Sequence, residues 1–158
     1  MDDRTWLTKE YLPKLSGRIL YVGTNNYTQP YSKLVQPNSV YETLDSSIER
    51  SVFGSDIHHN VDVLNHNPNY LYDHISMYGC HGYTGYNIDN SHIKKDMEKL
   101  SSLVKVGGTL QFGPGCGYDP KYNRRFWENF VTESPFDEYD VLHNTLNGVN
   151  YIWWGVKK

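Results

Sequence analysis

Four side chains of this chain have the chemistry to bind a small ligand or to move a proton. Asp45 lies at the end of an apolar stretch, Asp62 lies near the end of another, and His81 and Tyr83 lie in a loop rich in glycine and tyrosine. A carboxylate at a strand end can accept hydrogen bonds from both hydroxyls of a ribose, or it can cap the following turn. A histidine can remove a proton near neutral pH, although a surface histidine without a catalytic role fits the same pattern.

The histidines and cysteines do not form a metal-binding pattern. His58 and His59 are adjacent, so on a strand they point to opposite faces, and either one is an alternative base to His81. No nearby carboxylate completes a recognised ligand spacing. The two cysteines, Cys80 and Cys116, lie outside any metal motif and form no disulfide framework. We therefore expect no metal site.

The elements that position these side chains begin with residues 18–28, where a short apolar strand runs into a turn. Gly23 ends the strand and allows a sharp turn of the backbone. Asn25 and Asn26 tolerate a positive φ, and Thr28 can cap a short helix. A strand, a tight turn and a helix N-terminus in succession are typical of a nucleotide site. An ordinary strand and turn without a ligand is the alternative.

The rest of the chain alternates between strand and helix patterns. This alternation predicts a parallel sheet with helices on both faces, closed by a hairpin that adds an antiparallel strand. The predicted fold is a single α/β domain over residues 1–158, with a Rossmann-like, doubly wound, mostly parallel sheet of about seven strands and an antiparallel C-terminal strand. Gly107 and Gly108 are expected to end the longest helix. The expected strands are 18–23, 40–44, 57–64, 70–78, 109–112, 139–143 and 149–156, and the expected helical segments are 4–15, 30–35, 90–104 and 124–131.

Composition excludes several classes of function. The net charge of −3 gives no general basic field, which argues against duplex nucleic acid as a partner. The amino end is polar, and no apolar run approaches the length of a membrane span, so we expect a soluble, cytoplasmic protein with no membrane partner. Trp153 and Trp154 lie on the last expected strand, and if they are half exposed they indicate a homodimer contact.

Several short motifs follow the same order as a known family. They are Thr43-Leu44-Asp45 at the end of strand two, Asn60-Val61-Asp62-Val63-Leu64, Tyr72-Asp73-His74-Ile75 in strand four, and Lys105-Val106-Gly107-Gly108-Thr109-Leu110 before strand five. With the order of elements, they make residues 15–156 resemble the class I S-adenosylmethionine (SAM)-dependent methyltransferases. A subset of small bacterial and viral methyltransferase-like proteins, several associated with carbohydrate gene clusters, is more similar still. It shares the first loop, 23–31, and the loop 78–89.

The resemblance implies that SAM is the cofactor and assigns roles to individual residues. Asp45 would accept the ribose hydroxyls and Asp62 the adenine amino group, while His81 and Tyr83 would act as catalytic bases. The implied cofactor-binding residues are Gly23, Thr24, Asn25, Tyr27, Asp45, Asp62, Tyr78 and Gly79. The chain departs from the family in its first loop, because Tyr21 stands at the acidic position and only Gly23 of the three glycines is present.

Two functions from different classes agree with these patterns. The first is a SAM-dependent methyltransferase that acts on a small hydroxylated acceptor, such as a sugar or nucleotide-sugar. The alternative is a non-catalytic, methyltransferase-like scaffold or binding protein, which the altered first loop favours. A methyltransferase that acts on nucleic acid would need a basic groove or an Asn/Asp-Pro-Pro-aromatic motif, and the sequence contains neither.

Overall fold

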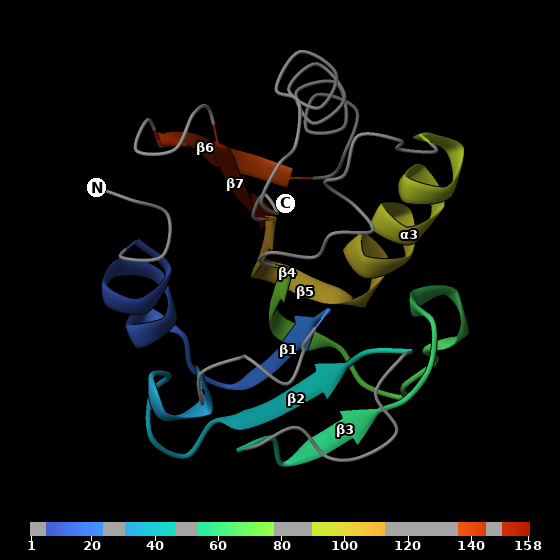
Figure 1. Cartoon of the computed structure of the whole chain (residues 1–158), viewed down its shortest axis with the longest axis horizontal. Coiled ribbons are helices and arrows are strands. Elements are labelled where there is room, and N and C mark those ends of the chain that lie inside the picture. Colours follow the sequence, from blue (N-terminus) through green and yellow to red (C-terminus); the bar gives the residue numbers. More distant parts are fainter. Residues whose placement is uncertain (1–5, 24–30, 47–53, 78–89, 113–135, 145–149) are drawn as a thin grey trace.

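A computed structural model describes residues 6–23, 31–46, 54–77, 90–112, 136–144 and 150–158. Its centre is a seven-stranded sheet in the order β3-β2-β1-β4-β5-β7-β6 (Figure 1). The strands are β1 (Arg18–Val22), β2 (Val40–Leu44), β3 (Ile57–His59), β4 (Tyr72–Met77), β5 (Val104–Phe112), β6 (Phe136–Asn144) and β7 (Asn150–Lys157). Strands β1 to β5 pair in parallel, and β7 pairs antiparallel with both β5 and β6. The predicted fold class is therefore confirmed.

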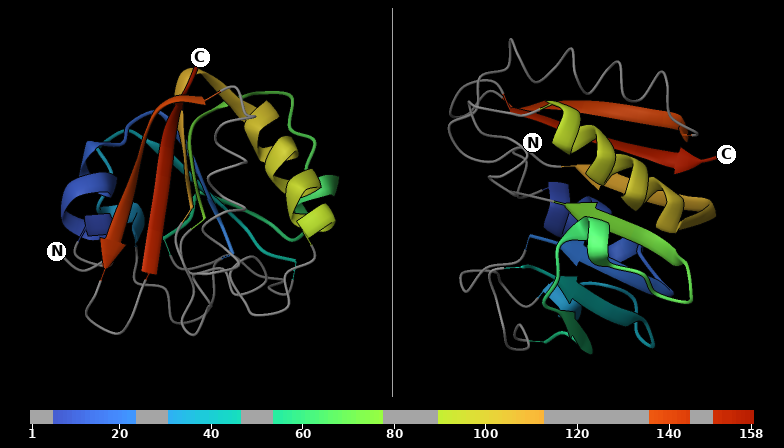
Figure 2. Two further views of the ribbon diagram at one scale, coloured as in Figure 1. Left: turned by 90° about the horizontal axis from the view of Figure 1, so that it is seen from above. Right: turned by 90° about the vertical axis from the view of Figure 1, so that its right-hand side faces the viewer.

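Helical segments cover both faces of the sheet, as Figure 2 shows from above. The long helix α3 (Asn90–Leu103) and the short η4 (Val63–Asn65) lie on one face. The other face carries η1 (Trp6–Tyr11), η2 (Leu12–Lys14) and η3 (Tyr31–Lys33). In the described part of the chain, no helix is long and apolar enough to cross a membrane.

The two covered faces explain the composition of the central strands. In β1, Leu20 and Val22 belong to the core cluster on the α3 face, whereas Ile19 and Tyr21 belong to the cluster on the opposite face. All four side chains are at most 2% exposed. A strand buried on both sides has no polar face, so it reads as an almost continuous apolar run.

Two expected elements differ from the structure, and a third is not covered by it. The expected strand 57–64 ends at His59, because the chain then forms the 3-10 turn η4, in which the N–H of Asn65 donates to Asp62 O at 3.0 Å. The amino-terminal helix is a π-helical turn followed by a 3-10 turn that contains Pro13, whose nitrogen cannot donate. The expected helix 124–131 lies outside the described residues.

The transition from α3 to β5 also differs from the expectation. Helix α3 ends at Leu103 and β5 begins at Val104, so the glycine pair 107–108 lies inside the strand. Gly107 has φ 81°, and the register between β4 and β5 shifts between the pairs that involve Tyr72 and His74. The glycines therefore form an irregularity of the strand, and the helix ends without a glycine cap.

Candidate functional site

The sheet has a topological switch point between β1 and β4. From β1 the chain moves outward to β2 and β3, and it then returns to form β4 on the other side of β1. The two strands are directly paired, with Leu20 beside Ile75 and Tyr21 beside Ser76. In open α/β sheets, ligands bind outside the carboxyl ends of the strands at such a point. The carboxyl edge of β1, β2 and β4 is therefore the candidate site.

Gly23 shapes the first turn of this edge. It follows β1 directly and has φ 80°, a left-handed conformation that costs a residue with a Cβ roughly 1–2 kcal/mol. Its N–H donates to Leu44 O at 2.9 Å, which ties the end of β1 to the end of β2. The end of the strand and the freedom of the backbone expected at Gly23 are thus both present, whereas the loop that follows lies outside the described residues.

Asp45 occupies the corresponding place after β2. Its N–H donates to His59 O at 3.1 Å, and its own carbonyl accepts from the Asn60 side-chain amide at 3.2 Å. The same amide donates to Ser46 O at 3.0 Å. The backbone at Asp45 is thus hydrogen-bonded to the end of β3, which fixes the point from which the Asp45 side chain extends. The residue is half-buried.

Asp62 lies on the connection that follows β3. It precedes η4 in an extended conformation with ψ 154°, and its side chain makes no capping hydrogen bond. The residue is exposed. The structure thus places Asp62 before a 3-10 turn, and an exposed carboxylate in this position remains able to receive a donor.

The other predicted site residues lie outside the described part of the chain. Tyr78 follows directly after Met77, the last residue of β4. The roles assigned to these positions remain predictions. They are Thr24, Asn25, Tyr27, Tyr78, Gly79, His81 and Tyr83.

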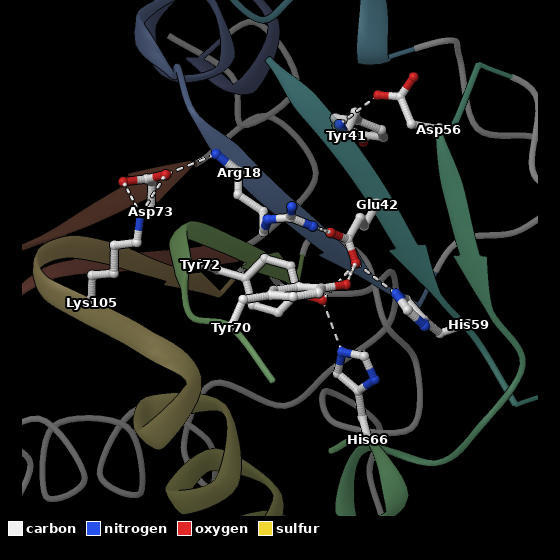
Figure 3. A network of polar contacts seen from close by, with 10 residues as sticks. All are labelled: Arg18, Tyr41, Glu42, Asp56, His59, His66, Tyr70, Tyr72, Asp73 and Lys105. Carbon is white, nitrogen blue, oxygen red and sulfur yellow. Dashed lines mark hydrogen bonds and ion pairs between the residues drawn. The ribbon is translucent and has the colours of Figure 1, made fainter. Parts of the chain in front are cut away.

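Sequence reasoning missed a buried polar network around Glu42, in the middle of β2. The Glu42 side chain has no exposed surface, and it accepts hydrogen bonds from four residues (Figure 3). Its Oε1 accepts from His59 Nε2 at 2.6 Å and from the hydroxyls of Tyr70 and Tyr72, each at 2.8 Å. Its Oε2 accepts from the guanidinium of Arg18. We call these five residues, together with His66, the Glu42 network.

The hydrogen bonds determine which atoms carry protons. Tyr72 has one hydroxyl proton, and it gives this proton to Glu42, so the 2.8 Å contact with His66 requires Nε2 of His66 to donate. The rings of His59 and His66 lie 4.3 Å apart between centroids. Arg18 lies over the ring of Tyr70, 3.8 Å from its centroid, which adds a cation–π contact to the ion pair.

Burial and hydrogen bonding set the charges in the network. Burial alone would raise the pKa of Glu42, but hydrogen bonds from His59, the two tyrosines and Arg18 hold that pKa below its usual value. Burial, reinforced by the neighbouring His59, lowers the pKa of His66 from 6.5 to about 4. At neutral pH the network therefore contains a carboxylate and an uncharged His66.

The Glu42 network holds the β3–β4 connection against the sheet. Arg18 begins β1 and Tyr72 begins β4, whereas His66 and Tyr70 belong to the connection that also carries Asp62. The network thus reaches the amino ends of β1 and β4 through Arg18 and Tyr72, and the carboxyl end of β3 through His59. Its signal in the sequence was weak, since a single Glu within a strand is most often read as a solvent-facing residue.

No protein-family model matches the sequence, and no curated protein is similar to it in sequence. Solved structures do match. N-methyltransferase NodS from Bradyrhizobium japonicum WM9, in complex with S-adenosyl-L-homocysteine, has a TM-score of 0.64 and 15% identity over 89% of this chain and 78% of NodS. SAM-bound CalS10, an amino pentose methyltransferase from Micromonospora echinaspora, has a TM-score of 0.66 and 11% identity over 99% and 88% of the two chains.

A third match is the sugar N-methyltransferase KedS8 from Streptoalloteichus sp. ATCC 53650, with a TM-score of 0.66 and 10% identity. The alignment covers 90% of this chain and 81% of KedS8. At these identities the similarity establishes the fold. The chain has the fold of the class I SAM-dependent methyltransferases.

Proposed function

We propose that this protein is a SAM-dependent methyltransferase that acts on a small hydroxylated acceptor, such as a sugar or nucleotide-sugar. One observation carries the proposal. At the switch point of a methyltransferase-type sheet, a left-handed Gly23 follows β1, and an acidic residue, Asp45, is fastened at the end of β2. A glycine at the end of the first strand and an acidic residue after the second are the features with which sheets of this kind bind the ribose of a nucleotide cofactor.

The described residues at this edge fit the cofactor chemically. A ribose offers two hydroxyl donors, and the Asp45 carboxylate is an acceptor whose backbone is fixed by bonds to His59 and Asn60. Asp62 is exposed and makes no capping bond, so its carboxylate can accept from an adenine amino group. Gly23 presents no Cβ where the chain passes closest to the cofactor tail.

The sulfonium of SAM supplies an activated methyl group, so the protein has two remaining tasks. It must align the acceptor with the methyl group, and it must remove a proton where the acceptor needs to lose one. We assign proton removal to His81 and Tyr83, in the loop after β4. Tyr78 and Gly79, at the start of that loop, would lie beneath the transferred group.

The acceptor class rests on two arguments. CalS10 is an amino pentose methyltransferase and KedS8 a sugar N-methyltransferase, and both share this fold across most of the chain. The net charge of −3 also favours a small acceptor over nucleic acid, which is held mainly through its phosphates. The first argument points to a sugar-like molecule, and the second argues only against nucleic acid.

Calorimetric titration with SAM and with S-adenosylhomocysteine tests the proposal. We expect micromolar binding of both by the wild type. Asp45→Ala should weaken binding at least about a hundredfold, because it removes two hydrogen bonds to a charged acceptor. Asp56→Ala is the matched control, since that carboxylate lies in the same β2–β3 connection but accepts from the backbone N–H of Tyr41 at 2.8 Å.

The control should lose some thermal stability and keep its affinity for the cofactor. If neither ligand binds the wild type at millimolar concentration, the methyltransferase proposal is wrong. The scaffold alternative would then be pursued through partner proteins.

A further inference from the structure

One register row of the sheet carries polar side chains on five neighbouring strands. We call it the polar row. Each member is the second-to-last residue of its strand, and each is paired with its neighbours in the row. Paired residues of a parallel sheet point to the same face, so these side chains line one face just below the carboxyl edge. From β3 to β5 the members are His58, Thr43, Tyr21, Ser76 and Gln111.

The row contrasts with the residues that follow it. The last residues of β1, β2 and β4 are Val22, Leu44 and Met77, and all three belong to the apolar cluster on the α3 face. On β1, β2 and β4, polarity is thus confined to one face at the level of the candidate site. It is the face of the second cluster, to which Tyr21 belongs.

Some polar atoms of the row have a hydrogen-bond partner, and one does not. Thr43 Oγ1 and His58 Nδ1 are 2.7 Å apart, and the Ser76 hydroxyl donates to Gln111 Oε1. The other end of the Gln111 amide, Nε2, has no hydrogen-bond partner, although Gln111 has no exposed surface. Among the described residues it is the one buried side-chain nitrogen or oxygen in this state.

An open, buried amide is costly, and a folded protein rarely keeps one without a use. Ser76 can satisfy only one end of the amide, so the other end stays open however the group is turned. A methionine in place of Gln111 would fill a similar volume and would have no polar group that needs a hydrogen-bond partner. With Oε1 held by Ser76 the open end is Nε2, so the pair has the features of a donor kept for a ligand.

The position of the pair suits the methyl acceptor better than the cofactor. Asp45 follows β2, on one side of the switch point, whereas Ser76 and Gln111 lie on β4 and β5, on the other side. Strands are spaced by roughly 5 Å, so Gln111 lies roughly 10 Å across the sheet from β1. A methyl group delivered at the switch point would reach the space above β4 and β5.

We propose that Ser76 and Gln111 form the floor of the acceptor subsite, with Gln111 Nε2 donating a hydrogen bond to an oxygen of the acceptor. This inference rests on the proposed function. The row contains no lysine or arginine, so it offers no cation to an anionic group. The oxygen it selects is uncharged, such as a hydroxyl or ring oxygen of a sugar.

The test uses protein saturated with S-adenosylhomocysteine, and the probes are methyl α-D-glucopyranoside and UDP-glucose. In 15N-labelled protein, the side-chain amide resonance of Gln111, assigned by its absence in Gln111→Met, should shift saturably with at least one probe. Gln111→Met should bind that probe about tenfold more weakly. Its affinity for S-adenosylhomocysteine should be unchanged, and its melting temperature should be equal or higher.

Thr43→Val is the matched control, since it removes a polar member of the same row that already has a partner. It should melt at a lower temperature and keep its affinity for the probe. Two results overturn the inference: a Gln111 resonance that neither probe shifts, or a Gln111→Met variant that keeps probe affinity and melts at a lower temperature.

Failure of S-adenosylhomocysteine to bind at all would count against the proposed function. The Gln111 inference would then be judged by the same resonance with each probe alone. A saturable shift would support the inference, and the absence of a shift would overturn it.

Discussion

Glu42 shows how a charged residue can be stable inside the sheet. Its carboxylate is fully buried, and burial of an isolated charge is strongly unfavourable. Four donors surround it, two of them tyrosine hydroxyls from either side of Leu71, and Arg18 supplies a positive charge. The Glu42 network stabilises the fold only while it is complete. Without the carboxylate its donors would lose their acceptor, and without a donor the buried charge would lose part of its compensation.

We expect Glu42→Gln to lower the free energy of unfolding by about 2–4 kcal/mol. The amide removes the charge that Arg18 pairs with, and it turns a donor toward other donors. Glu10→Gln is the control, since Glu10 forms only an exposed pair with Lys14 at 3.9 Å, and the change should cost less than about 0.5 kcal/mol. Chemical denaturation of both variants measures the difference. Equal losses would contradict the importance of the network.

The stability should fall as the pH is lowered from 6.5 toward 4. Burial lowers the pKa of His66 to about 4, so between these values the unfolded chain binds a proton that the folded chain does not. Well above pH 6.5 the titration of His66 costs no stability. By pH 4 it lowers the free energy of unfolding by about 3 kcal/mol. Glu42, whose pKa is also lowered, adds a loss in the same direction at still lower pH. The charged or titratable neighbours of His66 are His59, Glu42 and Lys99, with Tyr72 as its hydrogen-bond partner.

Denaturation of His66→Gln over the same pH range checks this assignment. The Gln amide can still donate to the Tyr72 hydroxyl, but it does not titrate. The variant should therefore show a flatter dependence of unfolding free energy on pH between 6.5 and 4.5. Parallel curves for the two proteins would mean that His66 does not cause the loss.

At the scale of elements, Asp73 joins the amino ends of three strands. Its Oδ2 accepts from the backbone N–H of Arg18 in β1 at 2.8 Å, and Lys105 in β5 pairs with it at 3.3 Å. Gly17 and Gly108 pack closely against it, because a Cβ on Gly17 would lie 2.2 Å from Asp73 Oδ2 and one on Gly108 would lie 2.5 Å from Asp73 O. The glycines are required here by close approach of the backbones.

The adjacent glycines of β5 allow this requirement to be measured. Gly108→Ala places a Cβ against the backbone oxygens of Asp73 and Lys105, so it should destabilise the protein by about 3 kcal/mol. Gly107→Ala meets nothing within 4 Å, and its cost should be only the strain of φ 81°, about 1–2 kcal/mol. Thermal denaturation ranks the two variants. An equal or reversed order would show that the strand tolerates the added methyl group.

At the scale of the whole molecule, the alternation of apolar runs and turns was enough to predict the fold. The bounds of β2 and the extent of α3 were close to the expectation, because both depend on local periodicity. The sequence could not show that Gly107 and Gly108 lie inside β5, since that depends on contact with Asp73 across the sheet. It could not show the Glu42 network either, because the four donors come from four separate positions between Arg18 and Tyr72.

The candidate site was predictable to a similar degree. Gly23 and Asp45 could be placed because strand ends of a parallel sheet meet at one edge. Asp62 was expected at a strand end, but it precedes a 3-10 turn, since the chain leaves β3 after His59. The polar row could not be recognised from sequence, because its members are brought together only by the register of five strands.

The central claim is that the carboxyl edge between β2 and β4 binds SAM, and a crystal structure of the complex with S-adenosylhomocysteine tests it most directly. The account predicts the ribose hydroxyls within hydrogen-bond distance of the Asp45 carboxylate, the adenine beside Asp62, and the homocysteine tail next to Gly23. A ligand bound elsewhere, or contacting neither carboxylate, would contradict the account.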